Sequence, residues 1–271
     1  MRKIFLALCI IALISSGSYA SDKNRAYYPA VLGYHELKPI PLNEFDTTPE
    51  AFASQLDWLK DNGYETLSLE EFISYLKKDE GFPEKSVLIT FDDGYNGIYY
   101  YAFPELKKRG MKAAFFITAS TIGGIKGTKY PHITYEQLAE MAADGNMSIG
   151  SHTISHLRLT ELSSDALKIE VSKSKQILEN FTGRKIQAIA YPEAYYNGAV
   201  IDAVKEAGYE IAFAGGDSGL FGHESWFSIP RIFTGLELAE NNNALFAEFV
   251  RNYKNMPEGA FKSRWKPIEK K

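Results

Sequence analysis

The sequence predicts an α/β fold built as one domain around a parallel sheet, and three features support this prediction. Short apolar runs alternate along the chain with longer amphipathic stretches, as strands alternate with crossover helices. Most of the runs are apolar at consecutive positions, which is typical of strands covered on both faces. A chain of 271 residues with 45% apolar composition can also form a single sizeable core.

Apolar runs that are predicted as strands span residues 30–35, 87–93, 112–118, 147–152, 186–191, 209–215 and 227–233. This number of parallel strands suits either a barrel or a doubly wound sheet. In both architectures the active site lies at the C-terminal ends of the strands. Chemically active side chains are therefore expected at those ends.

Amphipathic stretches that are predicted as helices span residues 48–63, 68–78, 134–145, 163–183, 198–208 and 236–253. Local signals mark their starts: Pro49 follows the capping residue Thr48, and Ser68 and Glu71 have the spacing of a capping box. The helix at 163–183 carries an apolar stripe that is expected to face the core. This stripe consists of Leu167, Val171, Ile177, Leu178 and Phe181.

Residues 1–20 have the pattern of a secretory signal peptide. Arg2 and Lys3 precede an apolar run and a small-residue end, so cleavage is expected after Ala20. A retained membrane anchor is the alternative, but the apolar run is short for a span, which needs roughly 20 residues. We therefore expect an exported protein that is periplasmic or extracellular, at the cell envelope.

Residues 21–271 are expected to form one domain, with a core at about 28–235 and a C-terminal helix and tail at 236–271. Cys9, the only cysteine, lies in the predicted signal peptide, so no disulfide is expected. Without the signal peptide the chain has 28 basic and 34 acidic side chains, a net charge of −6. This balance does not indicate a nucleic-acid partner, and no second apolar run is long enough to span a membrane.

Polar side chains follow several predicted strands at their C-terminal ends. These residues are His35 after the first strand, Asp92 and Asp93 after the second, His152 after the fourth, and Tyr191 and Pro192 after the fifth. Because the C-terminal ends of parallel strands lie together, we expect these side chains to share one site.

His152 and His156 are the strongest indication of a metal site. Two histidines at this spacing on a helical turn point to the same side and can bind one ion. With one carboxylate they form a set that leaves coordination positions open, as catalytic sites do. The alternative is that the two histidines only cap a loop.

The adjacent aspartates Asp92 and Asp93 cannot both serve the same function. Successive side chains of a strand point to opposite faces, so one carboxylate can bind the metal while the other faces the attacking water. The same divergence disfavours a glycosidase, because its two carboxylates stand on either side of one sugar bond, roughly 5 Å or more apart.

The motifs "TFDDG" (90–94) and "SHTISH" (151–156) together resemble those of the polysaccharide deacetylases, carbohydrate esterase family 4. The resemblance runs from "VLGYHEL" to "IPRIF", most of the chain. It implies a distorted (β/α)7-type barrel and metal-dependent removal of N-acetyl groups from amino sugars. It further implies that Asp92 is the general base, and that Asp93, His152 and His156 hold one divalent metal ion, with Zn²⁺ expected.

The stretch "PAVLGYHEL" resembles the subgroup that contains the exopolysaccharide poly-N-acetylglucosamine deacetylases. In that subgroup a histidine of an N-terminal Tyr-His pair acts as the general acid, which implies this role for His35; a histidine satisfied in the core is the alternative. Arg231, in the apolar "FSIPRIF", is expected to orient Asp92 or to form a structural salt bridge, because a buried charge needs a partner.

The stretch "AYPEAYYN" (190–197) departs from the Tyr-Pro-Tyr-Gly pattern of that subgroup, with Glu193 and Ala194 at its third and fourth positions. The resemblance implies that Tyr191, Pro192 and Glu193 lie beside the substrate oxyanion, with a backbone N–H as donor. The Glu193 carboxylate could also compete as a metal ligand or repel anionic glycans. Trp226 could stack on a sugar ring or pack in the core.

The other two histidines, His132 and His223, are predicted to be loop residues without a catalytic role. The leading functional prediction is an exported, metal-dependent deacetylase of N-acetylated glycans. A catalytically silent glycan-binding module of the same fold is the alternative from another class. A deacetylase or deformylase of a small or lipid-linked amino sugar, or of an O-acetyl ester, is a further alternative.

Overall fold

The computed structural model describes residues 29–78, 81–124, 128–215, 226–235 and 243–253. Its parallel strands form one sheet in the order β7-β6-β5-β4-β3-β1-β8, and β2 pairs with β3 outside this path. The strands are β1 (Ala30–Tyr34), β2 (Glu65–Thr66), β3 (Ser86–Phe91), β4 (Ala113–Ile117), β5 (Met147–Ser151), β6 (Ala188–Ala190), β7 (Ile211–Phe213) and β8 (Ile232–Phe233). Each predicted strand run overlaps one of them, and only β2 was not predicted.

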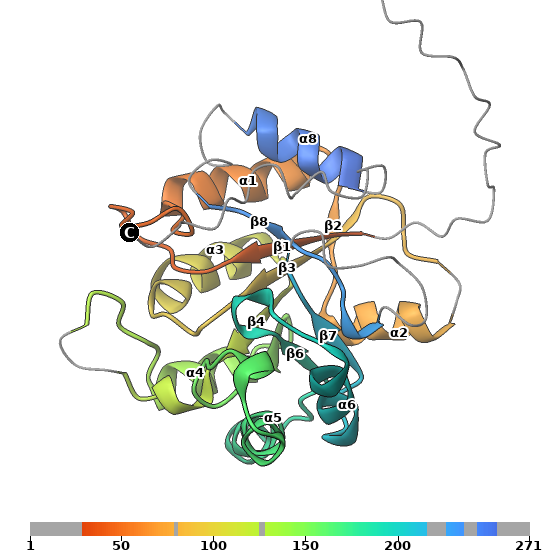
Figure 1. Ribbon diagram of the computed structural model, residues 1–271. Coiled ribbons are helices and arrows are strands. Elements are labelled where there is room, and N and C mark those ends of the chain that lie inside the picture. The colour runs from red at the N-terminus through yellow and green to blue at the C-terminus, as the bar shows by residue number, and fades with distance from the viewer. Residues whose placement is uncertain (1–28, 79–80, 125–127, 216–225, 236–242, 254–271) are drawn as a thin grey trace, which may run out of the picture.

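The segment at 226–235 connects the two edges of the curled sheet. Ile229 pairs with β7, its N–H donating to Ala212 O at 3.0 Å, whereas β8 pairs with β1 through Leu32 and Ile232. The prediction of one strand over 227–233 was wrong because Pro230 has no N–H to donate, and the chain changes partner there. The sheet is therefore a distorted (β/α)7 barrel in a single domain (Figure 1).

Helices surround the central strands (Figure 1). The α-helices are α1 (Pro49–Asp61), α2 (Leu69–Lys78), α3 (Phe103–Arg109), α4 (Tyr135–Ala143), α5 (Ser164–Thr182), α6 (Gly198–Glu206) and α8 (Ala244–Asn252). Predicted caps are present: the Thr48 side chain accepts from Ala51 N–H, and the Ser68–Glu71 capping box forms both of its hydrogen bonds. Helix α3 was not predicted, and it follows a π-helical turn η1 (Ile98–Ala102).

The apolar stripe predicted on α5 was only partly correct. Leu167, Val171 and Leu178 are buried, but Ile177 and Phe181 are 41% and 36% exposed. The periodicity placed them together because apolar residues four apart on a helix share a face. The helix instead buries the polar side chains of Glu170, which accepts hydrogen bonds from the loop after β5, and Ser174, which accepts one from the Ser151 hydroxyl.

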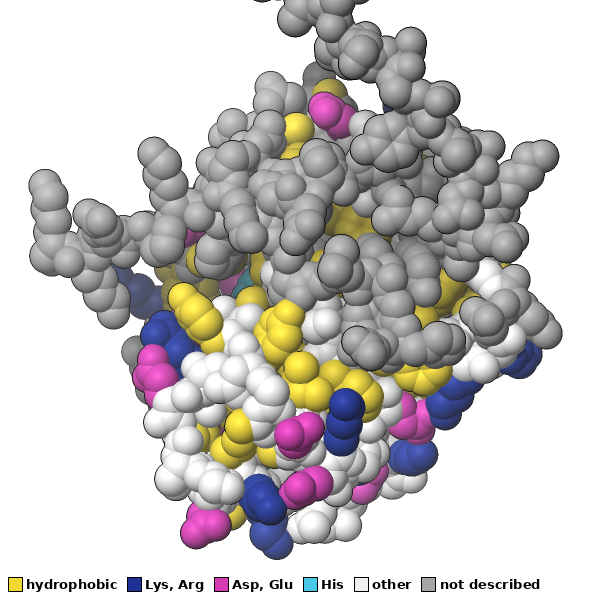
Figure 2. Space-filling view, turned by 45° about the vertical axis from the view of Figure 1, so that its right-hand side comes forward, with side chains coloured by type: hydrophobic (Ala, Val, Ile, Leu, Met, Phe, Trp, Pro, Cys, Tyr) yellow, Lys and Arg dark blue, Asp and Glu magenta, His cyan; other side chains and the backbone are white. Residues whose placement is uncertain are grey.

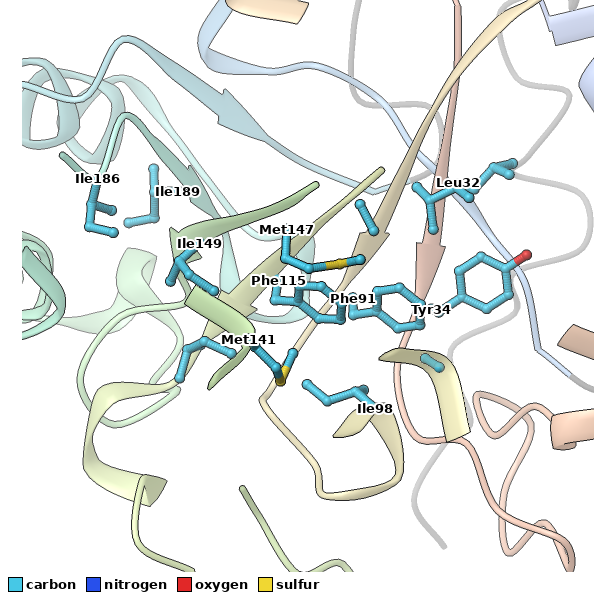
Figure 3. Packing of buried hydrophobic residues seen from close by; sticks show 14 of the residues in the cluster. Leu32, Tyr34, Phe91, Ile98, Phe115, Met141, Met147, Ile149, Ile186 and Ile189 are labelled. Carbon is cyan, nitrogen blue, oxygen red and sulfur yellow. The ribbon is translucent and has the colours of Figure 1, made fainter. Parts of the chain in front are cut away.

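Alternate residues of the strands supply two apolar clusters on opposite faces of the sheet. Leu32 and Ile89 belong to the cluster beneath the outer helices, whereas Val31 and Leu88 belong to the inner cluster that α2 closes. In the outer cluster the rings of Tyr34, Phe91 and Phe115 stand in a row across three neighbouring strands (Figure 3). This packing holds the strand ends in fixed positions.

The predicted signal peptide at 1–20 and the tail beyond 253 lie outside the described residues, as does 236–242 of the predicted C-terminal helix. Among the helices that the structure describes, none is long and apolar enough to cross a bilayer. On the face in Figure 2, acidic and basic side chains of the described residues are intermingled.

Candidate active site

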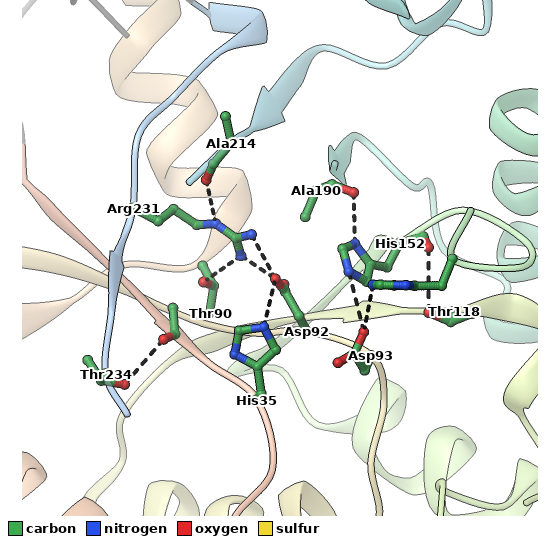
Figure 4. A network of polar contacts seen from close by, with 12 residues as sticks. His35, Thr90, Asp92, Asp93, Thr118, His152, Ala190, Ala214, Arg231 and Thr234 are labelled. Atoms are coloured by element: carbon green, nitrogen blue, oxygen red, sulfur yellow. Dashed lines mark hydrogen bonds and ion pairs between the residues drawn. The ribbon is translucent and has the colours of Figure 1, made fainter. Parts of the chain in front are cut away.

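The C-terminal ends of three strands of the sheet, β1, β3 and β5, bring the predicted site residues together. His35 follows β1, Asp92 and Asp93 follow β3, and His152 follows β5. Figure 4 shows two adjoining groups, one around Asp92 and one around Asp93. The two aspartates enter different groups, but strand alternation is not the reason, because both lie beyond β3 and Asp93 has a positive φ of 70°.

Asp92 is buried and is held by a bidentate ion pair with Arg231. Arg231 Nη1 donates to Asp92 Oδ1 at 2.8 Å and Nη2 donates to Oδ2 at 2.7 Å. Arg231 is itself 1% exposed, and its Nε donates to Ala214 O at 3.0 Å. Burial alone would raise the pKa of the Asp92 carboxyl, but the Arg231 guanidinium outweighs it, aided by His152 and His35. The net pKa lies well below the ordinary range, so Asp92 is ionised at neutral pH.

His35 lies between Asp92 and the solvent. Its Nε2 is 4.0 Å from Asp92 Oδ2, and its side chain is 21% exposed. The ring packs between Phe45 and Phe233, with centroid distances of 5.3 and 5.4 Å. The histidine is therefore partly accessible, and its ring nitrogen is near the carboxylate that Arg231 orients.

Asp93, His152 and His156 converge on one point. The Asp93 Oδ1 atom lies 3.4 Å from His152 Nε2 and 3.3 Å from His156 Nε2. Their three ligand atoms all lie within 4.8 Å of one another, and this is the one such group among the described residues. Two histidines and one carboxylate are a donor set that open catalytic metal sites use.

The hydrogen bonding of His152 tests whether a cation fits this cluster. His152 Nδ1 lies 2.8 Å from Ala190 O, so this nitrogen carries the proton and donates it. Burial lowers the pKa of His152, although Asp92 and Asp93 oppose this effect, so the ring is neutral. Its unprotonated Nε2 therefore faces the Asp93 carboxylate, acceptor against acceptor. A cation between the two atoms resolves this repulsion, so the residues fit a metal ion.

The segment from His152 to His156 is not the helical turn that the spacing predicted. Thr153 and His156 have positive φ angles of 67° and 55°, and no helix forms there. The buried carboxylate of Glu170, on α5, accepts the N–H groups of Ile154 and Ser155 at 2.9 and 3.0 Å. The two histidine rings meet, at 4.8 Å between centroids, because this strained loop is held from outside.

The 191–195 segment follows β6 beside the metal-site residues, since Ala190 accepts the His152 hydrogen bond. Tyr191 is buried, and its hydroxyl donates to Phe227 O at 2.9 Å. Glu193 forms an ion pair with Arg158 and is not in the metal cluster, so the expected competition for the metal is not seen.

Trp226 is half-buried and packs against the inner apolar cluster. Its contact with a sugar ring remains a prediction. His223 lies outside the described residues.

Tyr95, which the sequence analysis did not single out, and His132, predicted as a loop residue without a catalytic role, both interact electrostatically with Asp93. The Tyr95 hydroxyl interacts with the Asp93 carboxylate, and burial and this interaction raise the pKa of Tyr95. The His132 ring is 4.8 Å from the Tyr95 ring, and burial lowers its pKa while Asp93 opposes this. The position of Tyr95 two residues after Asp93 was an available signal, but nothing local indicated His132.

Comparisons with a family model, with known protein sequences and with solved structures each find proteins similar to this chain. The model of the family described as polysaccharide deacetylase matches residues 79–212. A poly-β-1,6-N-acetyl-D-glucosamine N-deacetylase of Staphylococcus epidermidis is 30% identical over 241 residues, 81% of this chain and 82% of that protein. YxkH of Bacillus subtilis, named for the same family, is 39% identical over 67% of this chain, which spans 62% of its length.

Solved structures agree with the fold. The Streptococcus pyogenes deacetylase PplD, in complex with acetate, has a TM-score of 0.73 and 28% identity, covering 82% of this chain and 98% of PplD. IcaB from Ammonifex degensii has a TM-score of 0.69 and 26% identity, covering 79% of this chain and 97% of IcaB.

Proposed function

The chain belongs to the polysaccharide deacetylase family, carbohydrate esterase family 4, and from this premise we propose that it is an exported, metal-dependent hydrolase that removes N-acetyl groups from amino-sugar polysaccharides. The observation that carries the proposal is the convergence of Asp93, His152 and His156 directly beside the Asp92–Arg231 pair. The proposed reaction needs three metal ligands and a charged base close together, and these residues lie beside one another at the strand ends.

Asp93, His152 and His156 would hold one divalent ion, for which we propose Zn²⁺. When bound, the ion would polarise the acetyl carbonyl and lower the pKa of a coordinated water. The fixed tautomer of His152 supports this assignment, because its Nε2 is left as a free ligand atom.

Asp92 is proposed as the general base. Arg231 keeps the carboxylate ionised and fixes its plane by two hydrogen bonds. Each oxygen of a carboxylate can accept more than one hydrogen bond. Asp92 can therefore still take the proton of the attacking water, and its position beside Asp93 places it next to the metal ligands.

His35 is proposed as the general acid. It lies across from Arg231, with its Nε2 4.0 Å from Asp92 Oδ2, and its partial exposure allows contact with a substrate. In its protonated form it would donate a proton to the departing amine, which neutralises the leaving group as the C–N bond breaks.

The N–H of Glu193 is proposed as the oxyanion donor, by elimination within its segment. Pro192 has no N–H, and the N–H groups of Tyr191, Ala194 and Tyr195 donate to Phe213, Tyr191 and Pro192 carbonyls at 2.9, 3.0 and 3.2 Å. Within the described residues, the Glu193 N–H has no such acceptor. A free backbone donor can stabilise the charge that develops on the acetyl oxygen.

An N-acetylated glycan is proposed as the substrate, and the S. epidermidis relative, whose name specifies poly-β-1,6-N-acetyl-D-glucosamine, supports this class. Action at the periplasm or cell envelope is the corresponding proposal for location, supported by the signal-like pattern at 1–20.

Acetate release from β-1,6-linked N-acetylglucosamine oligomers tests the proposal. The purified protein is assayed with added zinc, with a chelator, and as the variant Asp92→Asn. We expect release by the zinc-supplied protein that both the chelator and the substitution abolish. Lack of release from any acetylated glycan by zinc-loaded protein that still binds the oligomers would instead favour the glycan-binding module. Release only from small or lipid-linked amino sugars or O-acetyl esters would change the substrate class.

A further inference from the structure

Arg158 connects two loops of the proposed site. It lies two residues after His156, and its Nη1 donates to Glu161 Oε1 at 2.8 Å. Its Nη2 pairs with the carboxylate of Glu193, in the loop after β6. The guanidinium also lies over the ring of Tyr195, 4.4 Å from its centroid. One side chain thus joins the loop that carries His156 to Glu193, within the turn at 193–194, and to Tyr195, which follows this turn.

This turn is strained. Glu193 and Ala194 have φ angles of 52° and 60°, so two successive residues with a Cβ occupy the left-handed region. Such conformations persist only where surrounding contacts enforce them. The Ala194 and Tyr195 N–H groups bond to carbonyls of the same segment, so they shape the turn without joining it to the histidine loop.

We propose that Arg158 is a positioning residue: by gripping Glu193 and Tyr195, it holds the strained turn so that the Glu193 N–H stays directed at the acetyl oxygen. The inference rests on the proposed function of the site. It assigns a role to the Glu193 carboxylate, which neither binds the metal nor is free to repel the substrate. The backbone hydrogen bonds of the turn shape it locally, and the ion pair adds the link to the histidine loop that they do not supply.

The expected effect is moderate. The side chains of Arg158 and Glu193 are 37% and 45% exposed, and ion pairs at such positions are weak singly. Deleting an oxyanion donor reduces kcat about 10²- to 10³-fold. Loosening a donor that remains present should therefore reduce kcat by about tenfold.

Kinetics of Arg158→Ala, Glu193→Gln and the double variant test the role. We expect each single variant to lose about tenfold in kcat at nearly unchanged KM and zinc content. The double variant should lose no more than either single one, because both remove the same contact. Arg158→Lys should recover only part of kcat, since an ammonium cannot grip both carboxylates and the ring as a planar guanidinium does. Additive losses, or a loss confined to KM, would overturn the inference.

Arg109→Ala is the matched control. Arg109 likewise bridges two carboxylates, Asp57 and Glu105, but it lies at the end of α3, toward the N-terminal ends of the strands. This variant should lower stability and leave kcat unchanged. Equal loss of kcat in Arg109→Ala and Arg158→Ala would mean that Arg158 acts only through stability.

Hydrogen exchange of the backbone supplies a readout that does not require activity. In Arg158→Ala the amides of residues 191–197 should exchange faster than in the unaltered protein, while those of α3 should not. Unchanged exchange in 191–197 would refute the positioning role whatever the activity. If the unaltered protein is inactive but exchange in 191–197 is still faster in Arg158→Ala, the proposed function is refuted. The restraint of the turn at 193–194 by Arg158 is then confirmed.

Discussion

The charge of Asp92 depends on Arg231. Its pKa is lowered on folding, so the pair stabilises the folded protein above the ordinary carboxyl pKa and loses that contribution as the pH falls through the lowered value. In Arg231→Gln the burial of Asp92 would act unopposed and raise its pKa. We expect the acidic limb of the kcat/KM profile to move to higher pH, with an activity loss of about 10² or more.

Arg231→Lys is the comparison for this experiment. It keeps the charge but not the bidentate grip, so the acidic limb should stay near its original position while kcat falls. Zinc content and the melting temperature of both variants separate these effects from misfolding. An acidic limb that does not move in Arg231→Gln would contradict the role of the ion pair.

Glu36 is a buried acid whose pKa is raised on folding, so its effect on stability changes with pH in the opposite direction to that of Asp92. Its Oε1 is buried and, among the described residues, without a hydrogen-bond partner. Burial raises its pKa to about 7, although Lys38 and the Gly97 N–H oppose this. Because the pKa of Glu36 is higher in the folded protein than in the unfolded chain, its contribution to stability is fully present below the unfolded pKa. This contribution is lost as the pH rises through the folded pKa of about 7. The loss is on the order of 3 kcal/mol.

Glu36→Gln should remove this loss. We expect the free energy of unfolding, measured in urea at pH 5 and pH 8, to differ less between the two values in the variant than in the unaltered protein. Glu65→Gln, at an exposed position of β2, is the control and should keep the original difference. An unchanged pH dependence in Glu36→Gln would show that Glu36 does not titrate in this range.

In helix α5, the residues that are buried differ from those that the apolar periodicity of the sequence assigned to the core. Leu178 is fully buried and its neighbour Ile177 is 41% exposed, although the sequence pattern assigned both to the core. Leu178→Ala should cost about 2–5 kcal/mol of stability, and Ile177→Ala about 0.5 kcal/mol or less. Denaturation of the two variants measures the difference. Equal losses of unfolding free energy in the two variants would instead support the apolar stripe that the sequence predicted.

The ends of elements were predicted best where a residue acts on its own backbone. The caps at Thr48 and Ser68 depend on side chains within three residues, so their signals are local. The strand at 227–233 was overestimated because its pairing partners, β7 and β1, lie far away in the sequence. The role of Glu170 was not predicted either, because the loop N–H groups that donate hydrogen bonds to it are 15 and 16 residues away in the sequence.

At the scale of the whole molecule, metal binding should stabilise the fold. Asp93 and His152 come from strands that β4 separates in the sheet, so an ion that joins them links distant parts of the chain. Zinc at 100 times its dissociation constant should add about 2.7 kcal/mol to the free energy of unfolding. Thermal denaturation with zinc and with chelator measures this shift.

Two variants check that the shift arises at the proposed site. His152→Ala should abolish the zinc-dependent stabilisation, whereas Asp92→Asn should keep most of it, since Asp92 lies outside the ligand group. A shift that persists in His152→Ala would place the ion elsewhere.

The alternation of strands and helices, and the placement of His35, Asp92, Asp93 and His152 at strand ends, could be predicted from the sequence alone. These follow from periodicity and from resemblance of motifs, which are properties of neighbouring residues. The fold was needed to see that Arg231 pairs with Asp92, one of two partners the sequence left open, that Arg158 pairs with Glu193, and that the histidine loop is strained rather than helical. Such contacts join segments up to 139 residues apart, and their energy depends on burial, which no local pattern contains.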